Sequence, residues 1–220
     1  MVWAPNVGIT YPFGEPIPPA SLPYLDTNND GVVNGLDDPY LPYYPGDQYV
    51  DWVGLSLYYY PESNSAANSV PAASYFQDNM VGSGPNIQYL NNQVLQNGGL
   101  HNFYSRFAEA RKKPLMLPET AAPWVSAWSS ASTTETIVKE NWWQQIFTAY
   151  QTKFPLLKLV VFFEEQKVDA TTGLSNIRDW RIMSNPEVRN AFIKDQAAGG
   201  TMFAHATDIK FNCKGEVNWN

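Results

Sequence analysis

Residues 49–58 read Tyr-Val-Asp-Trp-Val-Gly-Leu-Ser-Leu-Tyr, a run in which aliphatic side chains alternate with small or aromatic ones. This alternation is typical of a β-strand, because successive side chains point to opposite faces. We expect Val53, Leu55 and Leu57 to pack against helices. The other face would then point into a barrel, with the last residue at its mouth: Trp52, Gly54, Ser56 and Tyr58.

Strands and helices are predicted to alternate along the chain. Three further apolar runs are predicted as strands: Val2 to Asn6, Pro114 to Glu119 and Leu157 to Glu164. Helical spacing of apolar residues occurs at Leu100 to Arg111, Thr134 to Phe154 and Pro186 to Ala198. Thr133 or Thr134 can cap the second helix, and Asn185 the third, which Gly199-Gly200 would end. This order indicates a parallel α/β sheet.

Two parallel architectures compete, an open doubly wound sheet and a (β/α)₈ barrel. No glycine fingerprint for a dinucleotide or phosphate follows any predicted strand, and the connections after the first three strands are long and rich in Pro, Gly, Asn and Ser. Both features favour the barrel, whose active-site face is made of such loops. We expect residues 1–198 to form part of a barrel and residues 199–220 a tail.

The composition excludes several classes of protein. The chain is 44% hydrophobic and 15% aromatic, which predicts a globular fold. Its formal charge of −7 gives no basic stripe for nucleic acid, and no apolar run approaches the ~20 residues that cross a bilayer. The first residues do not resemble a secretory signal. With Cys213 as the only cysteine and only His101 and His205, neither an internal disulfide nor a cysteine- or histidine-rich metal site is expected.

Glu119 is the main catalytic candidate. It ends the run Leu115-Met116-Leu117-Pro118-Glu119, in which period-two alternation puts Leu115, Leu117 and Glu119 on one face. Barrel enzymes keep their chemistry at the carboxyl ends of their strands. A carboxylate there needs pairing or hydrogen bonds to offset its desolvation, so a functional role competes with that of a solvated strand-end glutamate.

A family resemblance rests on these same segments. Tyr44 to Leu55, YPGDQYVDWVGL, resembles the sixth-strand motif of family 26 glycoside hydrolases. Val2 to Asn6 is similar to the fifth strand of that family and Lys113 to Thr120 to its seventh. Leu159 to Phe163, with Asp179-Trp180-Arg181, is similar to the eighth strand and the element after it. The resemblance implies the C-terminal half of the barrel, strands five to eight.

The resemblance also implies an activity. Members of the family cleave β-linked polysaccharides, most often mannan, with retention, using two carboxyl groups ~5 Å apart and no catalytic cofactor. Glu119 matches the nucleophile and Tyr58 the tyrosine that hydrogen-bonds it. Trp124 and Phe162 or Phe163 are candidate platforms under the sugar, although ordinary packing explains them equally well. An extracellular location is implied by family alone.

The sequence departs from the family pattern at three points. Ser56 stands where an Asp is common, and Ala121 where a Gly is common, so the polysaccharide is not fixed. The His-Glu dipeptide that carries the general acid at the end of the fourth strand does not occur in these residues. We expect that strand to precede Met1. A carbohydrate-binding protein without turnover is therefore the alternative function.

A second motif is Asp26 to Asp37, DTNNDGVVNGLD, which fits the twelve-residue calcium-loop pattern. Oxygen ligands would come from Asp26, Asn28, Asp30, Val32, Asn34 and Asp37. The usual last Glu is Asp37, and Pro23 and Pro39 argue against flanking helices. A structural calcium loop therefore competes with a cluster of turns. A calcium-dependent docking module is disfavoured, because only one such loop is present.

Overall fold

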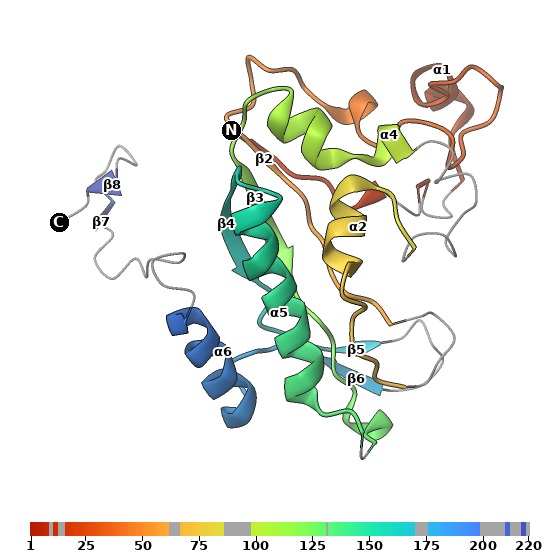
Figure 1. Cartoon of the computed structure of the whole chain (residues 1–220). Helices are drawn as coiled ribbons and strands as arrows, with labels where there is room; N and C mark the ends of the chain where they lie inside the picture. The colour runs from red at the N-terminus through yellow and green to blue at the C-terminus, as the bar shows by residue number, and fades with distance from the viewer. Residues whose placement is uncertain are drawn as a thin grey trace.

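The main sheet has four parallel strands, in the order β1 (Val2–Trp3), β2 (Trp52–Gly54), β3 (Leu115–Thr120) and β4 (Leu157–Phe162) (Figure 1). The computed structural model describes residues 1–8, 11–12, 16–61, 67–85, 98–130, 132–169, 176–198, 210–211 and 217–218. Each of the four predicted runs coincides with one of these strands, although β3 extends one residue beyond its run, to Thr120, so the chain is an α/β protein as predicted. A parallel bridge between Asn6 and Ser56 continues the pairing of β1 and β2 beyond the strands.

Two long helices follow β3 and β4, the last two strands of the main sheet. The first is α5 (Glu135–Thr152), capped as predicted by Thr134, whose hydroxyl accepts a hydrogen bond from the Ile137 N–H at 3.3 Å. The second is α6 (Pro186–Ala198), capped by Asn185, which accepts from the Glu187 N–H at 2.9 Å. The predicted end of α6 at Gly199-Gly200 lies outside the described residues.

The remaining helices are short. The predicted helix over Leu100 to Arg111 is instead α4 (Gly98–His101) followed by a π-helix (Tyr104–Glu109). The sequence did not predict α2 (Tyr75–Val81). Within the described residues the others are α1 (Leu22–Leu25) and three 3-10 helices, Pro19–Ser21, Leu41–Tyr43 and Ser126–Trp128. None of the helices in the described ranges is both long and apolar enough to span a bilayer.

Two small antiparallel pairs complete the described structure. One joins β5 (Gln166–Asp169) to β6 (Asn176–Asp179), and it lies at the end of the sheet where the parallel strands finish (Figure 1). The other joins β7 (Lys210–Phe211) to β8 (Val217–Asn218). A bridge between Trp124 and Asp179 connects β6 to the segment after β3.

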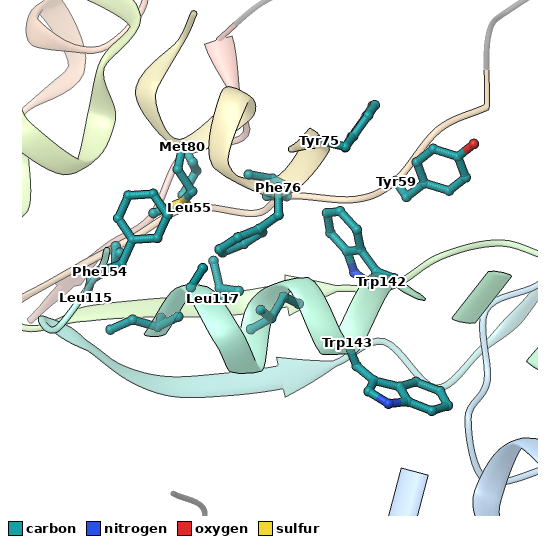
Figure 2. Packing of buried hydrophobic residues seen from close by; sticks show 14 of the residues in the cluster. Leu55, Tyr59, Tyr75, Phe76, Met80, Leu115, Leu117, Trp142, Trp143 and Phe154 are labelled. Carbon is teal, nitrogen blue, oxygen red and sulfur yellow. The ribbon is translucent and has the colours of Figure 1, made fainter. Parts of the chain in front are cut away.

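The core lies between the sheet and its helices. Val53 of β2 and the following Leu55 and Leu57 are fully buried in it, in one cluster with residues of α2 and α5, so this set faces helices as predicted. Figure 2 shows two neighbouring tryptophans on different sides of α5: Trp142 is directed towards Phe76 of α2, and Trp143 lies on the opposite side. Each large apolar side chain buried in this way contributes about 1.5–3 kcal/mol.

The opposite face of the sheet is tightly spaced at β2. A Cβ added at Gly54 would lie 2.8 Å from the Ala4 Cβ, 3.1 Å from Met116 Cγ and 3.3 Å from Pro118 Cδ. A glycine is therefore needed for the neighbouring strands to approach each other here. Towards the β4 edge the sheet is open, and Leu159 and Val161 are both 44% exposed.

Candidate functional site

One extra residue in β3 forms a bulge just before its end. The Leu55 N–H donates to the Met116 carbonyl at 3.1 Å, and two residues later the Leu57 N–H donates to the Glu119 carbonyl, also at 3.1 Å. Two steps along the chain after β2, from Leu55 to Leu57, thus correspond to three steps along β3, from Met116 to Glu119. The pairing of β3 with β4 shifts at the same place. Such bulges redirect side chains near the ends of strands.

The bulge corrects the predicted orientation of Glu119. Leu115 and Leu117 are buried in the core, and the next residue on their side is Thr120, which is also buried. The Trp142 indole of α5 donates to the Thr120 hydroxyl at 3.0 Å. Glu119 is exposed instead. The prediction that Glu119 shares the face of Leu115 and Leu117 is wrong, because simple alternation cannot include the extra residue.

Glu119 is hydrogen-bonded to Tyr58. The Tyr58 hydroxyl donates to Glu119 Oε2 at 3.0 Å, so the bond that the resemblance implies between these side chains is present. Burial, the hydrogen bond to Glu119 and the charge of that carboxylate all raise the pKa of Tyr58 well above its ordinary value. Tyr58 therefore stays protonated near neutral pH and acts as the donor of this bond.

Four rings form an aromatic cluster beside the carboxylate: Tyr58, Tyr60, Phe163 and Trp180. The Trp180 ring lies edge-on to Tyr58 at 5.2 Å and to Tyr60 at 5.6 Å between centroids. Phe163 meets Tyr58 edge-on at 5.7 Å. Trp180 is buried, whereas Tyr60 is 50% exposed, so Tyr60 is the member that presents most of its ring to solvent.

Backbone pairing fixes Trp180 in this cluster. The Trp180 N–H donates to the Glu165 carbonyl at 3.0 Å. Its neighbour Asp179 exchanges two backbone hydrogen bonds with Trp124, of 2.9 and 2.8 Å. The end of β6 and Trp180 are therefore joined by backbone hydrogen bonds to the loop after β3 and to the residues just before β5. These bonds place the Trp180 segment beside the end of the parallel sheet.

The structure separates the residues predicted to contact sugar. Tyr58 and Phe163 lie in the aromatic cluster with Glu119. Phe162 packs edge-on against Phe192 of α6, 5.3 Å between ring centroids, on the helix side of the sheet. Trp124 is only 7% exposed and belongs to the hydrophobic core. Ordinary packing accounts for the positions of these last two side chains.

Tyr60 and Trp180 were not predicted as members of the site. Tyr60 follows Tyr58 by two residues, so the alternation of the β2 segment carried to its end would have placed both on one face. Trp180 stands in the Asp179-Trp180-Arg181 triplet, which the resemblance identified as an element without giving it a contact. Its approach to Tyr58 depends on the β5–β6 pair, which the sequence did not predict.

The loop at residues 26–37 folds around its own polar side chains. Asp26 accepts hydrogen bonds from the Asp30 N–H at 3.1 Å and the Gly31 N–H at 2.8 Å. Asp30 accepts from the Val32 N–H at 2.9 Å, and Asn28 from the Asp30 N–H at 3.0 Å. Gly31 has φ +90°, a conformation that favours glycine. The carboxylates of Asp26 and Asp30 keep lone pairs for a cation.

Asp37 closes the same loop from within. It is fully buried and accepts from the Thr27 N–H at 2.6 Å and the Asn34 N–H at 2.8 Å. These bonds join the two ends of the loop without an ion. Over the ranges that the structure describes, no three His, Cys, Asp or Glu residues are grouped as a metal site.

No protein-family model and no curated protein matches this chain. The observations that bear on its function are therefore those of the site and of the sequence motifs.

Proposed function

We propose that this chain is the strand-five-to-eight part of a retaining glycoside hydrolase of the family 26 kind, with Glu119 as nucleophile. The observation that carries the proposal is the 3.0 Å hydrogen bond from Tyr58 to Glu119. These residues are 61 positions apart, in two separate motifs, and the resemblance pairs them. The substrate is a β-linked polysaccharide, mannan first, and the reaction needs no catalytic cofactor.

The topology supports a barrel more than an open sheet. All four strands are parallel, and their order in the sheet is their order in the chain. A doubly wound sheet reverses its strand order at the site where ligands bind, whereas barrel strands follow one another in sequence. Glu119 also lies near the carboxyl end of β3, the end at which barrel enzymes carry out their chemistry.

The hydrogen bond also suggests which oxygen attacks. Tyr58 donates to Oε2, so Oε1 is the oxygen directed to the anomeric carbon. A bond forms between Oε1 and that carbon as the glycosidic C–O bond breaks, and the leaving oxygen takes a proton from a second carboxyl group. Water then hydrolyses the glycosyl ester. The donor to Oε2 fixes the orientation of the carboxylate for the first of these steps.

The described carboxylates nearest in sequence to the cluster are poor candidates for the proton donor. Glu164 accepts hydrogen bonds from the Ile182 N–H at 2.6 Å and the Met183 N–H at 3.1 Å. Asp179 is paired with Arg181 at 2.7 Å. Glu164 is therefore committed to two backbone N–H groups and Asp179 to Arg181. The sequence also contains no His-Glu dipeptide. The nucleophile, Glu119, therefore lies in this chain, whereas no described residue is assigned as the general acid.

The aromatic cluster supports a sugar as ligand. Pyranose rings present apolar C–H faces that pack on aromatic side chains, and Tyr60 is half-exposed beside Glu119's partner Tyr58. An extracellular location follows from a polysaccharide substrate too large to enter a cell. The alternative function is carbohydrate binding without turnover, which the absence of a His-Glu dipeptide favours.

Binding and hydrolysis by three proteins test the proposal: the wild type, Glu119→Gln and the matched surface control Glu187→Gln. We expect all three to be retarded by mannan in affinity electrophoresis, because the aromatic cluster is intact in each. In a protein that also contains the general acid, only Glu119→Gln should lose turnover on mannan, mixed-linkage glucan and xylan. Hydrolysis by Glu119→Gln at the rate of the control variant would show that Glu119 is not the nucleophile.

The proposal includes a structural calcium ion in the loop at residues 26–37. Support comes from the spacing of its oxygen ligands and from Gly31 at the position of the sharp turn. Val33, within the loop, is buried. Asp37 accepts hydrogen bonds from the Thr27 and Asn34 N–H groups, which hold the two ends of the loop together around the proposed ligands.

A further inference from the structure

Lys139 is a buried cation close to the N-terminal end of α5. Its side chain is 1% exposed. Burying an ammonium group is costly unless it is paired, and the positive end of a helix makes the position less favourable still. Glu135, one turn earlier, accepts a hydrogen bond from Lys139 Nζ at 2.6 Å. An apolar side chain would fill the same space without this desolvation cost. The contacts of the ammonium group with other segments therefore indicate what a lysine does at this position.

Those contacts are with the segment that carries Trp180. Lys139 Nζ donates to the Arg181 carbonyl at 2.6 Å and lies 3.9 Å from Asp179 Oδ1. Arg181 in turn donates to both oxygens of Asp179, at 3.0 and 2.7 Å. Burial alone would raise the pKa of Asp179, but the Arg181 hydrogen bonds and the Lys139 charge hold it below its usual value. The residues on both sides of Trp180 are thus bound to α5.

A second contact from α5 reaches the other side of the site. One turn after Lys139, the Trp142 indole donates to the Thr120 hydroxyl, next to Glu119. α5 therefore holds both the end of β3, with the nucleophile candidate, and the segment of Trp180, which packs on Tyr58. The two segments are linked through Tyr58, whose ring packs on Trp180 and whose hydroxyl donates to Glu119.

We propose that Lys139 is a positioning residue for the site: it sets the place of Trp180 against Tyr58 and thereby the donor geometry at Glu119. An effect of Lys139 on sugar binding rests on the function proposed above, whereas its effect on the position of Trp180 does not. Lys139 itself touches neither Glu119 nor a ligand. Its role is carried through the backbone of Arg181 and the ring of Trp180.

The test reads the Trp180 signal directly. The near-ultraviolet circular dichroism band of Trp180 is obtained as the difference between the wild type and Trp180→Phe, and again between Lys139→Met and the double variant. We expect Lys139→Met to lose most of this band while far-ultraviolet circular dichroism is retained. Lys153→Met is the matched control, because Lys153 lies at the other end of α5 and bonds Gln77. It should keep the band.

A purely structural role for Lys139 would lower the melting temperature without changing the Trp180 band of the folded protein. An unchanged band in Lys139→Met overturns the proposal. If that variant does not fold, Glu135→Gln replaces it, since it removes the negative charge from one of the two close acceptors of Lys139 and should shift the same band less. An unchanged band in folded Glu135→Gln is then the contrary result.

A second arm separates this inference from the proposed function. Calorimetric titration with mannohexaose should give a dissociation constant about two- to tenfold higher for Lys139→Met than for Lys153→Met, the range expected from a displaced aromatic contact. If the band changes but the wild type binds no mannohexaose, the positioning role stands and the proposed function fails. If the wild type binds mannohexaose but the band is unchanged in Lys139→Met, the positioning role fails and the proposed function stands.

Discussion

Tyr58 and Glu119 come from neighbouring strands and meet where those strands end. A hydrogen bond between a neutral hydroxyl and a carboxylate contributes about 1.5–3 kcal/mol, more than a bond between neutral groups. Because the pKa of Tyr58 is raised, the hydroxyl keeps its proton and cannot accept one from a ligand near neutral pH. At the scale of single residues, Tyr58 therefore orients Glu119 by donating a hydrogen bond to it.

Removal of this one donor should slow the reaction without abolishing it. For Tyr58→Phe we predict a roughly ten- to hundredfold slower release of dinitrophenolate from an activated aryl β-mannoside, followed by absorbance. Tyr49→Phe, at an exposed position before β2, is the control and should match the wild type. A Tyr58→Phe rate equal to the control would mean that the hydrogen bond does not support the nucleophile.

The sequence identified these two residues but not how Glu119 is oriented. Both stand in motifs long enough to align, so their pairing could be predicted. The run Leu115 to Glu119 fits a regular strand as well as a bulged one, because the extra residue leaves no mark on the pattern of side chains. Its presence is shown only by the hydrogen bonds to β2 and β4, which depend on distant residues.

Among the elements, those held by long-range contacts were the ones that the sequence missed. Helix α2 has seven residues and depends on burial of Phe76 and Met80. The Phe76 N–H, which has no partner within its own helix, donates to the Gln145 side chain of α5 at 3.0 Å. Local propensity cannot supply such a bond. The long helix α5, with its Thr134 cap and regular apolar spacing, was predictable from local signals.

The loop at residues 26–37 should bind calcium and become more resistant to protease. Ligation adds an ion to a loop already closed by Asp37, so binding stabilises the folded state by mass action. Calorimetric titration and limited proteolysis measure the two effects. Asp30→Ala should lose both, and Asp51→Ala, an exposed aspartate outside the loop, should keep both. No heat and unchanged proteolysis at millimolar calcium would leave a cluster of turns.

In the molecule as a whole, the four-stranded sheet has two unpaired edges, β1 and β4, within the described residues. The face beside β4 exposes Leu159 and Val161. Strand edges next to exposed apolar side chains promote association, whereas a closed barrel has no edges. The order of the four strands was predictable from the sequence. Closure into a barrel cannot be read from four strands, since it depends on which segments pair with the two edges.

These 220 residues on their own should self-associate. Sedimentation or light scattering should give a mass above the 24.8 kDa of one chain, and the excess should rise with concentration. Val161→Lys, which places a charge on the open face beside the β4 edge, should shift the distribution towards the monomer. The matched change Val168→Lys, on the exposed β5–β6 pair, should not. A wild-type protein that stays monomeric at high concentration would show that the edges are protected.

The assignment of Glu119 as nucleophile is tested most directly by covalent trapping with a 2-deoxy-2-fluoro-β-mannoside that carries a dinitrophenolate leaving group. This leaving group departs without protonation, so the reaction does not need the general acid. The bond from Glu119 to the anomeric carbon forms as the bond to the aryl oxygen breaks, and the fluorine slows hydrolysis of the ester. We predict a mass gain of one fluoroglycosyl group on the peptide containing Glu119, absent from Glu119→Gln. A folded, mannan-binding protein that gains no label, or gains it on another residue, would contradict the account.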